Sequence, residues 1–227
     1  MAESLNLKNC LNLPDDFEGY DKDLFNLPPH YKSCVSRVLI PHGMIMDRIE
    51  RLGVDILTDL KKDNITSVNM LCVLKGGYRF FSDLQDKMNL VNGLSVGSNS
   101  SVELLVDFIR TKSYENDAST GKVTITGLEK MEALRGRDVL VVEDIVDTGK
   151  TMVELLKVLK TYEPKSIRVA CLVRKRTSKS NKFVPDFVCF EVPEKFVVGY
   201  AFDFNEYFRD MMHVCVMNAQ GIEKYQV

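Results

Sequence analysis

The residues with the clearest chemical potential lie between Val139 and Thr151, in the sequence V-L-V-V-E-D-I-V-D-T-G-K-T. Two adjacent carboxylates, Glu143 and Asp144, precede a third at Asp147, and Thr148 to Thr151 follow directly. Carboxylates accept hydrogen bonds from sugar hydroxyls and ligate hard cations such as Mg²⁺. Exposed amides at the start of a helix attract phosphate. The motif therefore predicts a ligand with one phosphate and hydroxyls or a metal ion nearby, a description that a phosphoribosyl group fits.

Two other interpretations of this motif are weaker. The phosphate loop of nucleoside triphosphatases also contains Gly-Lys-Thr, but it requires a glycine where this chain has Asp144. Three carboxylates would also repel a triphosphate. The purely structural alternative makes Asp147 the N-cap of the next helix and leaves Lys150 in solvent. It would be preferred for one residue alone, but the combination of acids, glycine and helix after a buried strand favours binding.

The elements that must position this motif form repeated strand-loop-helix units. Val139–Val142 is an apolar run typical of a buried parallel strand, and apolar residues after Thr151 recur with a helical period. A second unit comprises a strand over Val68–Leu74, a turn at Lys75-Gly76-Gly77 and a helix over Tyr78–Met88. Two such units predict an α/β sheet, in which ligands bind at the carboxyl ends of the strands.

The rest of the chain adds elements around these two units. We expect an amphipathic helix over His42–Lys61, further strands, an irregular hood segment in the first 38 residues, and a polar lid loop over Thr111–Lys122. The further strands are expected at Val102–Arg110, Val123–Gly127, Ser166–Val173, Phe187–Val192, Phe196–Phe204 and Val214–Met217.

The composition of the chain indicates how many domains it forms and which classes of partner it does not favour. A chain of 227 residues with 45% hydrophobic residues predicts one domain over 1–227. A net charge of -2 and a pI of about 6.0 give no support for a nucleic-acid or anionic-membrane partner. The six cysteines are widely spaced without a C-x-x-C pair, which indicates core thiols. With no signal peptide and no apolar stretch of about 18 residues, we expect a cytoplasmic protein.

The motif E-D-I-V-D-T-G-K-T resembles the phosphoribosyl pyrophosphate loop of the purine phosphoribosyltransferase family, and other stretches narrow the resemblance to its hypoxanthine-guanine branch. These stretches are Ile40–Leu52, Cys72–Tyr78, Val106–Tyr114, Val173–Thr177 and Lys195–Asp210. The resemblance begins near Gly19 and implies the type I fold: a mostly parallel twisted sheet flanked by helices. It also implies a small hood formed by about 1–38 and 178–227, and a lid over about 111–122.

The resemblance implies a reaction in which a 6-oxopurine base displaces pyrophosphate from phosphoribosyl pyrophosphate, with Mg²⁺ as cofactor. Glu143 and Asp144 are then expected to hold the ribose hydroxyls and metal, and Asp147 to act as general base toward the purine N7 proton. The expected phosphoribosyl site comprises Glu143, Asp144, Ile145, Val146, Asp147, Thr148, Gly149, Lys150 and Thr151.

The same resemblance assigns pyrophosphate to Lys75, Gly76 and Arg209, with a cis peptide between Leu74 and Lys75. Glycine lets the backbone approach phosphate oxygens closely, and a guanidinium suits a bidentate phosphate contact. Taken alone, Lys75 would be a solvated turn lysine. Its place before two glycines and after a buried strand favours the binding role.

Purine recognition is implied for Lys175, Lys195, Phe196, Val197 and Asp203. Lys175 would donate to the purine O6, which disfavours 6-amino rings because an ammonium cannot accept a hydrogen bond. Phe196 would stack on the base, the Val197 backbone would read its other edge, and Asp203 would serve a second Mg²⁺ and the guanine amino group. Without the resemblance, Lys175 would belong to a solvated basic patch and Phe196 to the core.

Further implications concern closure, assembly and departures from the family pattern. Ser113 and Tyr114 lie in the expected lid, and the family implies homodimers or homotetramers. A weakly active paralogue or a regulator that only binds phosphoribosyl pyrophosphate is the alternative function, and loss of Asp147 would be its sign.

The chain departs from the family pattern in three places. Arg174 stands where the family pattern has an apolar strand residue, the stretch 92–101 is unlike the family, and the first 18 residues have no counterpart.

Overall fold

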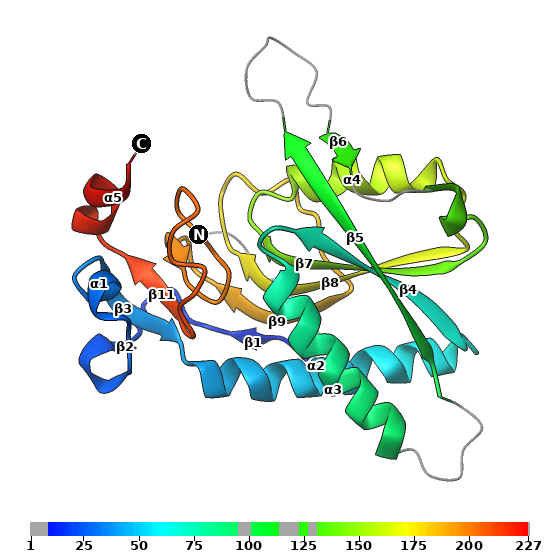
Figure 1. Ribbon diagram of the computed structural model, residues 1–227, viewed down its shortest axis with the longest axis horizontal. Coiled ribbons are helices and arrows are strands. Elements are labelled where there is room, and N and C mark those ends of the chain that lie inside the picture. The colour runs from blue at the N-terminus through cyan, green and yellow to red at the C-terminus, as the bar shows by residue number, and fades with distance from the viewer. Residues whose placement is uncertain (1–8, 95–100, 114–122, 127–130, 227) are drawn as a thin grey trace.

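The computed structural model describes residues 9–94, 101–113, 123–126 and 131–226, and its centre is a seven-stranded sheet (Figure 1). The strand order is β1-β9-β8-β7-β4-β5-β6, and every neighbouring pair is parallel except β5 and β6. The strands are β1 (Leu11–Asn12), β4 (Ser67–Leu74), β5 (Glu103–Ser113), β6 (Val123–Thr126), β7 (Asp138–Val146), β8 (Ser166–Lys175) and β9 (Phe187–Val192).

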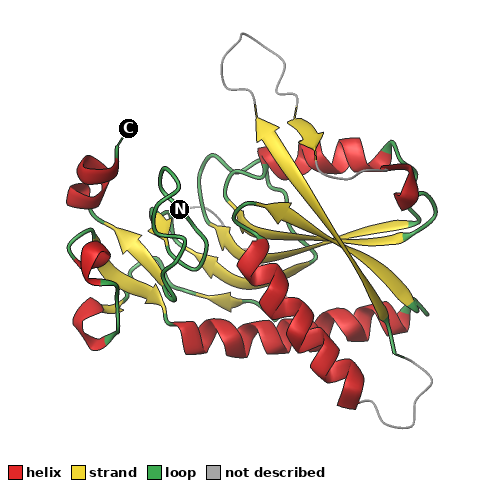
Figure 2. Cartoon of the chain, in the orientation of Figure 1, coloured by secondary structure: helices red, strands yellow, loops and turns green. Residues whose placement is uncertain are grey.

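Helices cover both faces of this sheet (Figure 2). Strand residues alternate between the two sides, so Met70 and Cys72 of β4 pack with α2 (His42–Lys62) and α3 (Tyr78–Leu94). The intervening Leu71 and Val73 pack with α4 (Lys150–Lys160) on the other side. The shorter helices are η1 (Lys22–Leu24), α1 (Pro29–Lys32), η2 (Met131–Leu134) and α5 (Ala219–Tyr225).

A second, antiparallel sheet draws on both ends of the chain and has the order β10-β11-β3-β2. Its strands are β2 (Tyr20–Asp21), β3 (Val35–Ile40), β10 (Val197–Val198) and β11 (Val214–Met217). The expected α/β class with a small hood is confirmed. The ranges 1–38 and 178–227 also supply β1 and β9 to the large sheet. That the whole chain forms one domain stays a prediction, which a core cluster shared by Val197, Val214 and Met70 supports.

Several elements are longer or shorter than expected. β7 continues through Glu143 and Asp144 to Val146, because β8 pairs with it as far as Arg174. β5 continues to Ser113, so the expected lid begins inside a strand, and 114–122 lies outside the described residues. The expected strand over 196–204 reduces to Val197–Val198. Among the described residues, no helix is both long and apolar enough to cross a bilayer.

Candidate active site

Two carboxylates project from the last residues of β7, where the carboxyl ends of β4 and β8 also lie. Oε1 of Glu143 accepts the Asp144 amide at 3.2 Å, and Oδ1 of Asp144 accepts the Ile145 amide at 2.8 Å. Burial raises the pKa of Glu143, and the neighbouring Asp144 charge raises it further. Burial also raises the pKa of Asp144. A ligand that supplies hydroxyl donors or positive charge would therefore favour the ionised pair.

The turn after β4 packs directly on this acid pair. A Cβ atom on Gly76 would lie 1.8 Å from Oδ2 of Asp144, and one on Gly77 would lie 2.5 Å from the carbonyl oxygen of Val73. The peptide between Leu74 and Lys75 is cis, as the family resemblance implied. The two glycines therefore let the Lys75 turn approach the end of β7 more closely than any other residue would allow.

Asp147 does not cap the next helix, so the structural alternative for this residue is wrong. α4 begins at Lys150, and its N-cap is Gly149, whose φ of 79° is in the left-handed region. The Asp147 carboxylate is instead half-exposed, and its Oδ2 accepts a hydrogen bond from Nζ of Lys175 at 3.1 Å. This contact joins the expected general base to the expected purine-reading lysine.

The loop before α4 has a partner that the sequence did not indicate. The Asn181 amide donates to the Thr148 carbonyl at 2.9 Å, and a Cβ on Gly149 would lie 2.3 Å from Oδ1 of Asn181. Asn181 also accepts the Phe183 amide at 3.0 Å, which forms a local side-chain turn. The segment around Asn181 thus supports the expected phosphate loop from outside. The only signal in the sequence was a short polar S-N-K run.

A cavity of about 180 Å³ collects the expected purine-binding residues. Its lining consists of Asp144, Ile145, Asp147, Lys175, Phe196, Val197, Phe202 and Asp203. Phe196 is 45% exposed and meets Phe204 edge to face, with ring centroids 5.6 Å apart. An exposed aromatic at a cavity rim is suited to stacking on a flat ring. Lys195 is not part of this lining among the described residues, although its chain neighbour is.

The two basic residues expected to bind pyrophosphate, Lys75 and Arg209, form ion pairs with the same carboxylate. Nζ of Lys75 is 2.7 Å from Oε2 of Glu206, and Nη2 of Arg209 is 3.5 Å from Oε1 of the same carboxylate. Arg209 also lies 2.9 Å from Oδ1 of Asp203. The hydrogen bond from Lys75 lowers the pKa of Glu206. Glu206 was missed in the sequence, although it lies three residues before Arg209.

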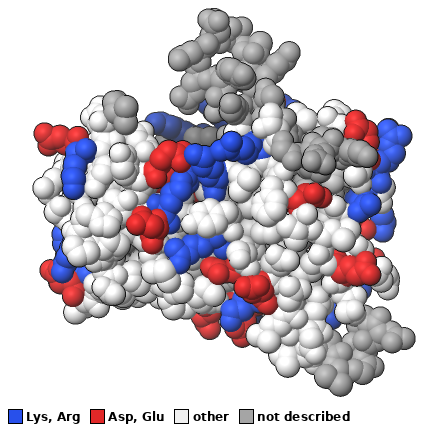
Figure 3. Space-filling model, viewed as in Figure 1, with Lys and Arg blue, Asp and Glu red and all other residues white. Residues whose placement is uncertain are grey.

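The segment that carries these charges has an unusual backbone. Residues with φ in the left-handed region are Gly199, Tyr200, Ala201, Asn205, Glu206 and Phe208. Such conformations are uncommon outside glycine and concentrate at functional sites. Figure 3 shows acidic and basic side chains gathered side by side on the face between the small sheet and the large one. In this segment Asp203 lines the same cavity as Asp144 of β7, and Glu206 reaches Lys75 in the turn after β4.

The donor set fits a magnesium ion that is also held by a substrate. No group of three metal-ligating side chains occurs among the described residues. Mg²⁺ usually takes one or two carboxylates and completes its shell with phosphate and water. Glu143 and Asp144 are adjacent acids whose raised pKa values a cation would reverse. Asp203 carries a carboxylate that Arg209 neutralises.

The expected lid residues give little further geometry. Ser113 is the last residue of β5, and Tyr114 lies outside the described residues.

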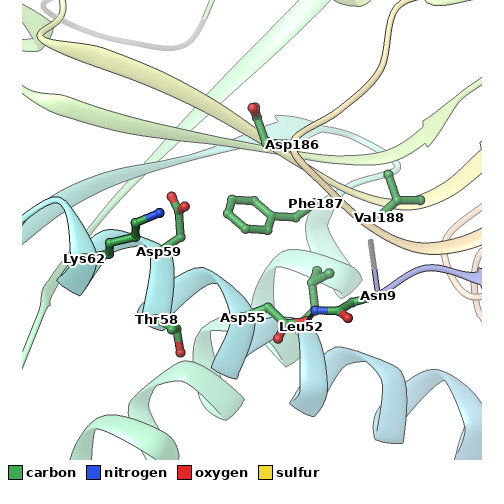
Figure 4. A pocket seen from close by; sticks show the side chains of 9 residues that line it. All are labelled: Asn9, Leu52, Asp55, Thr58, Asp59, Lys62, Asp186, Phe187 and Val188. Atoms are coloured by element: carbon green, nitrogen blue, oxygen red, sulfur yellow. Dashed lines mark hydrogen bonds between the residues drawn. The ribbon is translucent and has the colours of Figure 1, made fainter. Parts of the chain in front are cut away.

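A larger cavity, of about 330 Å³, lies away from this site (Figure 4). It is bounded by α2, the start of β9 and Asn9. Its three acids already have partners: Asp55 pairs with Arg51 and Asn9, Asp59 pairs with Arg168, and Asp186 accepts the Val169 amide. None of the candidate site residues described above lines it, so size alone does not make it the functional site.

Comparison with known proteins identifies the family of this chain. Residues 41–205 match the family described as phosphoribosyl transferase domain. The chain is 52% identical over 214 residues to hypoxanthine-guanine phosphoribosyltransferase of Mus musculus and 51% identical to that of Homo sapiens. Each alignment covers 94% of this chain and 95% of the relative. The crystal structure of hypoxanthine-guanine phosphoribosyltransferase from Schistosoma mansoni in complex with IMP has a TM-score of 0.80 and 38% identity, and covers 95% of this chain and 98% of that one.

Proposed function

The chain belongs to the phosphoribosyl transferase domain family and, within it, to the hypoxanthine-guanine phosphoribosyltransferases, and from this premise we propose its reaction. It is a purine-salvage enzyme that transfers the 5-phosphoribosyl group from phosphoribosyl pyrophosphate to hypoxanthine or guanine. The products are the nucleoside 5′-monophosphate, IMP or GMP, and pyrophosphate. Bond formation joins N9 of the base to C1 of the ribose as the bond from C1 to pyrophosphate breaks.

One contact carries this proposal: Nζ of Lys175 lies 3.1 Å from Oδ2 of Asp147 at the cavity. A 6-oxopurine presents O6 and N7 side by side on one edge. The ammonium matches O6 as a donor, and the carboxylate matches the N7 proton as an acceptor. Removing that proton makes the ring more electron-rich, so N9 attacks more readily. The pair therefore reads the base and activates it at the same edge.

The ribose phosphate fits the other end of the same loop. Glu143 and Asp144 would accept hydrogen bonds from the ribose hydroxyls, and the segment from Asp147 to Thr151 would wrap the 5′-phosphate. Gly149 has no side chain to cap α4, and the Lys150 amide makes a long hydrogen bond of 3.4 Å to Oγ1 of Thr148, a bond that a phosphate oxygen would replace. Bound Mg²⁺ would supply positive charge to the diphosphate, with Glu143, Asp144 and Asp203 as the residues that would hold it.

Lys75 and Arg209 would bind the pyrophosphate after exchanging Glu206 for phosphate oxygens. Both cations already converge on one carboxylate, so their spacing suits an anion with two charged groups. Gly76 brings the backbone beside the leaving group as well as beside Asp144.

The alternative, a weakly active paralogue or a regulator that only binds phosphoribosyl pyrophosphate, is not favoured. Asp147 is present and is held by Lys175 at the cavity. A protein that only binds the sugar phosphate would have no need for a base-activating carboxylate beside a purine-reading cation. We keep the alternative as an outcome of the assay below.

Steady-state assays with hypoxanthine, guanine, xanthine and adenine, each with Mg²⁺ and phosphoribosyl pyrophosphate, test the proposal. We expect nucleotide formation with hypoxanthine and guanine and discrimination against adenine. Binding of phosphoribosyl pyrophosphate without nucleotide formation from any base would support the regulator instead.

We also propose that the protein is cytoplasmic and that it forms a homodimer or a homotetramer. We further propose a lid over about 111–122 that carries Ser113 and Tyr114. The cysteines are free, and those other than Cys10 are buried, as suits a reducing compartment. Exposed apolar residues on α3 and β5 support assembly; they are Leu90, Leu94, Leu105, Val106 and Phe108. Light scattering of the purified protein would give the oligomeric state.

A further inference from the structure

Arg174 is a buried charge on β8 directly beside Lys175. Its side chain is 6% exposed, and its Nη1 donates to Oε1 of Glu191 at 2.9 Å, while the Glu191 side chain is 1% exposed. The two residues are directly opposite each other in the β8–β9 ladder. Buried charges persist only when they are paired, so a shift in register between these strands would leave both charges alone. The pair therefore fixes the alignment of β8 with β9.

Arg176 extends this arrangement on the far side of Lys175. Its Nε and Nη2 lie 3.1 and 2.7 Å from Oδ1 of Asp15, and it also donates to Asn12 and to the Leu13 carbonyl. The Arg176 amide donates to the Val192 carbonyl at 2.8 Å. The two buried arginines therefore tie the end of β8 to other segments, Arg174 to β9 through Glu191 and Arg176 to β1 and the residues that follow it.

Lys175 lies between these two anchors and has the opposite orientation. Side chains alternate along a strand, so Arg174 and Arg176 share one face while Lys175 points to the other. Its ammonium reaches Asp147 and the purine cavity. The backbone on each side of Lys175 is consequently held by a charged contact that does not itself enter the cavity.

The electrostatics explain why Arg174 matters to this arrangement. Burial raises the pKa of Glu191, and the charges of Arg174 and then Arg176 oppose that rise. Without Arg174, Glu191 would have to take up a proton or move toward water. Either change would act on the strand pair that carries Lys175. A misplacement of about 1 Å at a positioned group can cost up to about 100-fold in rate.

We propose that Arg174 and Glu191 form a positioning pair that in this chain fixes Lys175 and thereby maintains the preference of the site for 6-oxo over 6-amino purines. This inference rests on the proposed function, because it assigns a means of base discrimination to that same site. Arg174 touches neither substrate nor reacting atoms, so its effect is exerted through the backbone of β8.

The double substitution Arg174→Leu with Glu191→Leu tests the pair without leaving either charge unpaired, as Arg174→Leu alone would. The readout is the inhibition constant of adenine divided by the KM of hypoxanthine. We expect this ratio to fall about 10-fold, a discrimination typical of one lost contact, through a higher hypoxanthine KM. The KM of phosphoribosyl pyrophosphate should stay unchanged, and Arg174→Lys should retain most of the preference.

Arg168→Leu is the matched control, because Arg168 lies on the same strand and pairs with Asp59 and Asp63 at the opposite end. It should lower thermal stability without changing the ratio. A double variant that keeps the wild-type ratio, whatever its stability, would overturn the positioning role. Failure of the wild-type protein to convert any base would instead overturn the proposed function, and the inference would fall with it.

Discussion

The two ends of the candidate site hold their charges in different ways. The acids Glu143 and Asp144 belong to β7, are bonded to their own strand and carry raised pKa values because they are buried. The cations Lys75 and Arg209 lie on turns, where Glu206 and Asp203 neutralise them. The acid end is thus built into the sheet, whereas the basic end would have to exchange partners to bind an anion. Asp147 and Lys175 lie between these ends and already form a pair.

Because the two ends hold their charges differently, substitutions at the two ends should have effects of different size. Groups fixed by the sheet contribute preorganised geometry, so altering them should damage transfer strongly. An exposed ion pair such as Lys75 with Glu206 contributes little net energy, so altering it should shift binding only modestly. The following predictions test that contrast.

The largest effect is expected for Asp147→Asn. The amide keeps the shape of the side chain but cannot accept the N7 proton, so turnover should fall about 100-fold or more. Stopped or steady-state assays with hypoxanthine give the rate, and thermal unfolding provides the control for folding. Unchanged turnover would remove Asp147 from the chemistry.

Gly76→Ala should disturb the acid end from the neighbouring turn. Its Cβ would lie 1.8 Å from Asp144 Oδ2, so Asp144 or the turn must move. We expect about a 10-fold loss in kcat/KM for phosphoribosyl pyrophosphate, within the range for a misplaced positioning group. Gly93→Ala is the matched control, because no atom of the described residues lies within 4 Å of the Cβ position there. Equal effects in the two variants would contradict a close fit at Gly76.

Glu206→Gln should slightly strengthen the binding of pyrophosphate at the basic end, whereas Gly76→Ala should impair the use of phosphoribosyl pyrophosphate. The substitution removes a carboxylate that competes for Lys75 and Arg209, so product inhibition by pyrophosphate should become about 2- to 5-fold stronger, the scale of an exposed ion pair. Glu154→Gln, which breaks an exposed pair with Lys157 on α4, should change nothing. Weaker inhibition in Glu206→Gln would mean that Glu206 positions the cations instead of competing for them.

The stability of the acid end should depend on pH, and Glu143→Gln should change it only slightly. Because the folded pKa of Glu143 lies above its ordinary value, the folded protein loses stability as pH rises through that pKa. Glu143→Gln cannot ionise and escapes this loss. Denaturant unfolding should therefore show similar stabilities near pH 4 and a gain on the order of 1 kcal/mol for the variant at pH 8. A gain in the free energy of unfolding that is the same at both pH values would mean that ionisation of the buried Glu143 does not cause it.

Much of this fold followed from local patterns in the sequence. The apolar run before Glu143 and the helical period after Thr151 were enough to place a strand, a loop and a helix. The length of β7 was not predictable, because its last residues are ordered by pairing with β8, a contact between distant segments. The N-cap of α4 was not predicted for a similar reason: Asp147 forms a hydrogen bond with the distant Lys175, and Gly149 is the N-cap instead.

The residues that complete the site escaped prediction because only tertiary structure brings them there. Glu206 reaches Lys75 from a segment that lies far along the chain, and Asn181 supports the loop before α4 from beyond β8. Arg174 was noted only as a departure from the family pattern, and its buried partner Glu191 could not be identified without strand register.

The most direct test of the account is the stoichiometry of pyrophosphate release. Purified enzyme is mixed with Mg²⁺ and phosphoribosyl pyrophosphate, and pyrophosphate and nucleotide are measured together with and without hypoxanthine. We expect one pyrophosphate for each IMP formed and almost none without a base, since Asp147 and Lys175 would activate the purine and not water. Pyrophosphate release that proceeds equally well without hypoxanthine, or that yields no IMP, would contradict it.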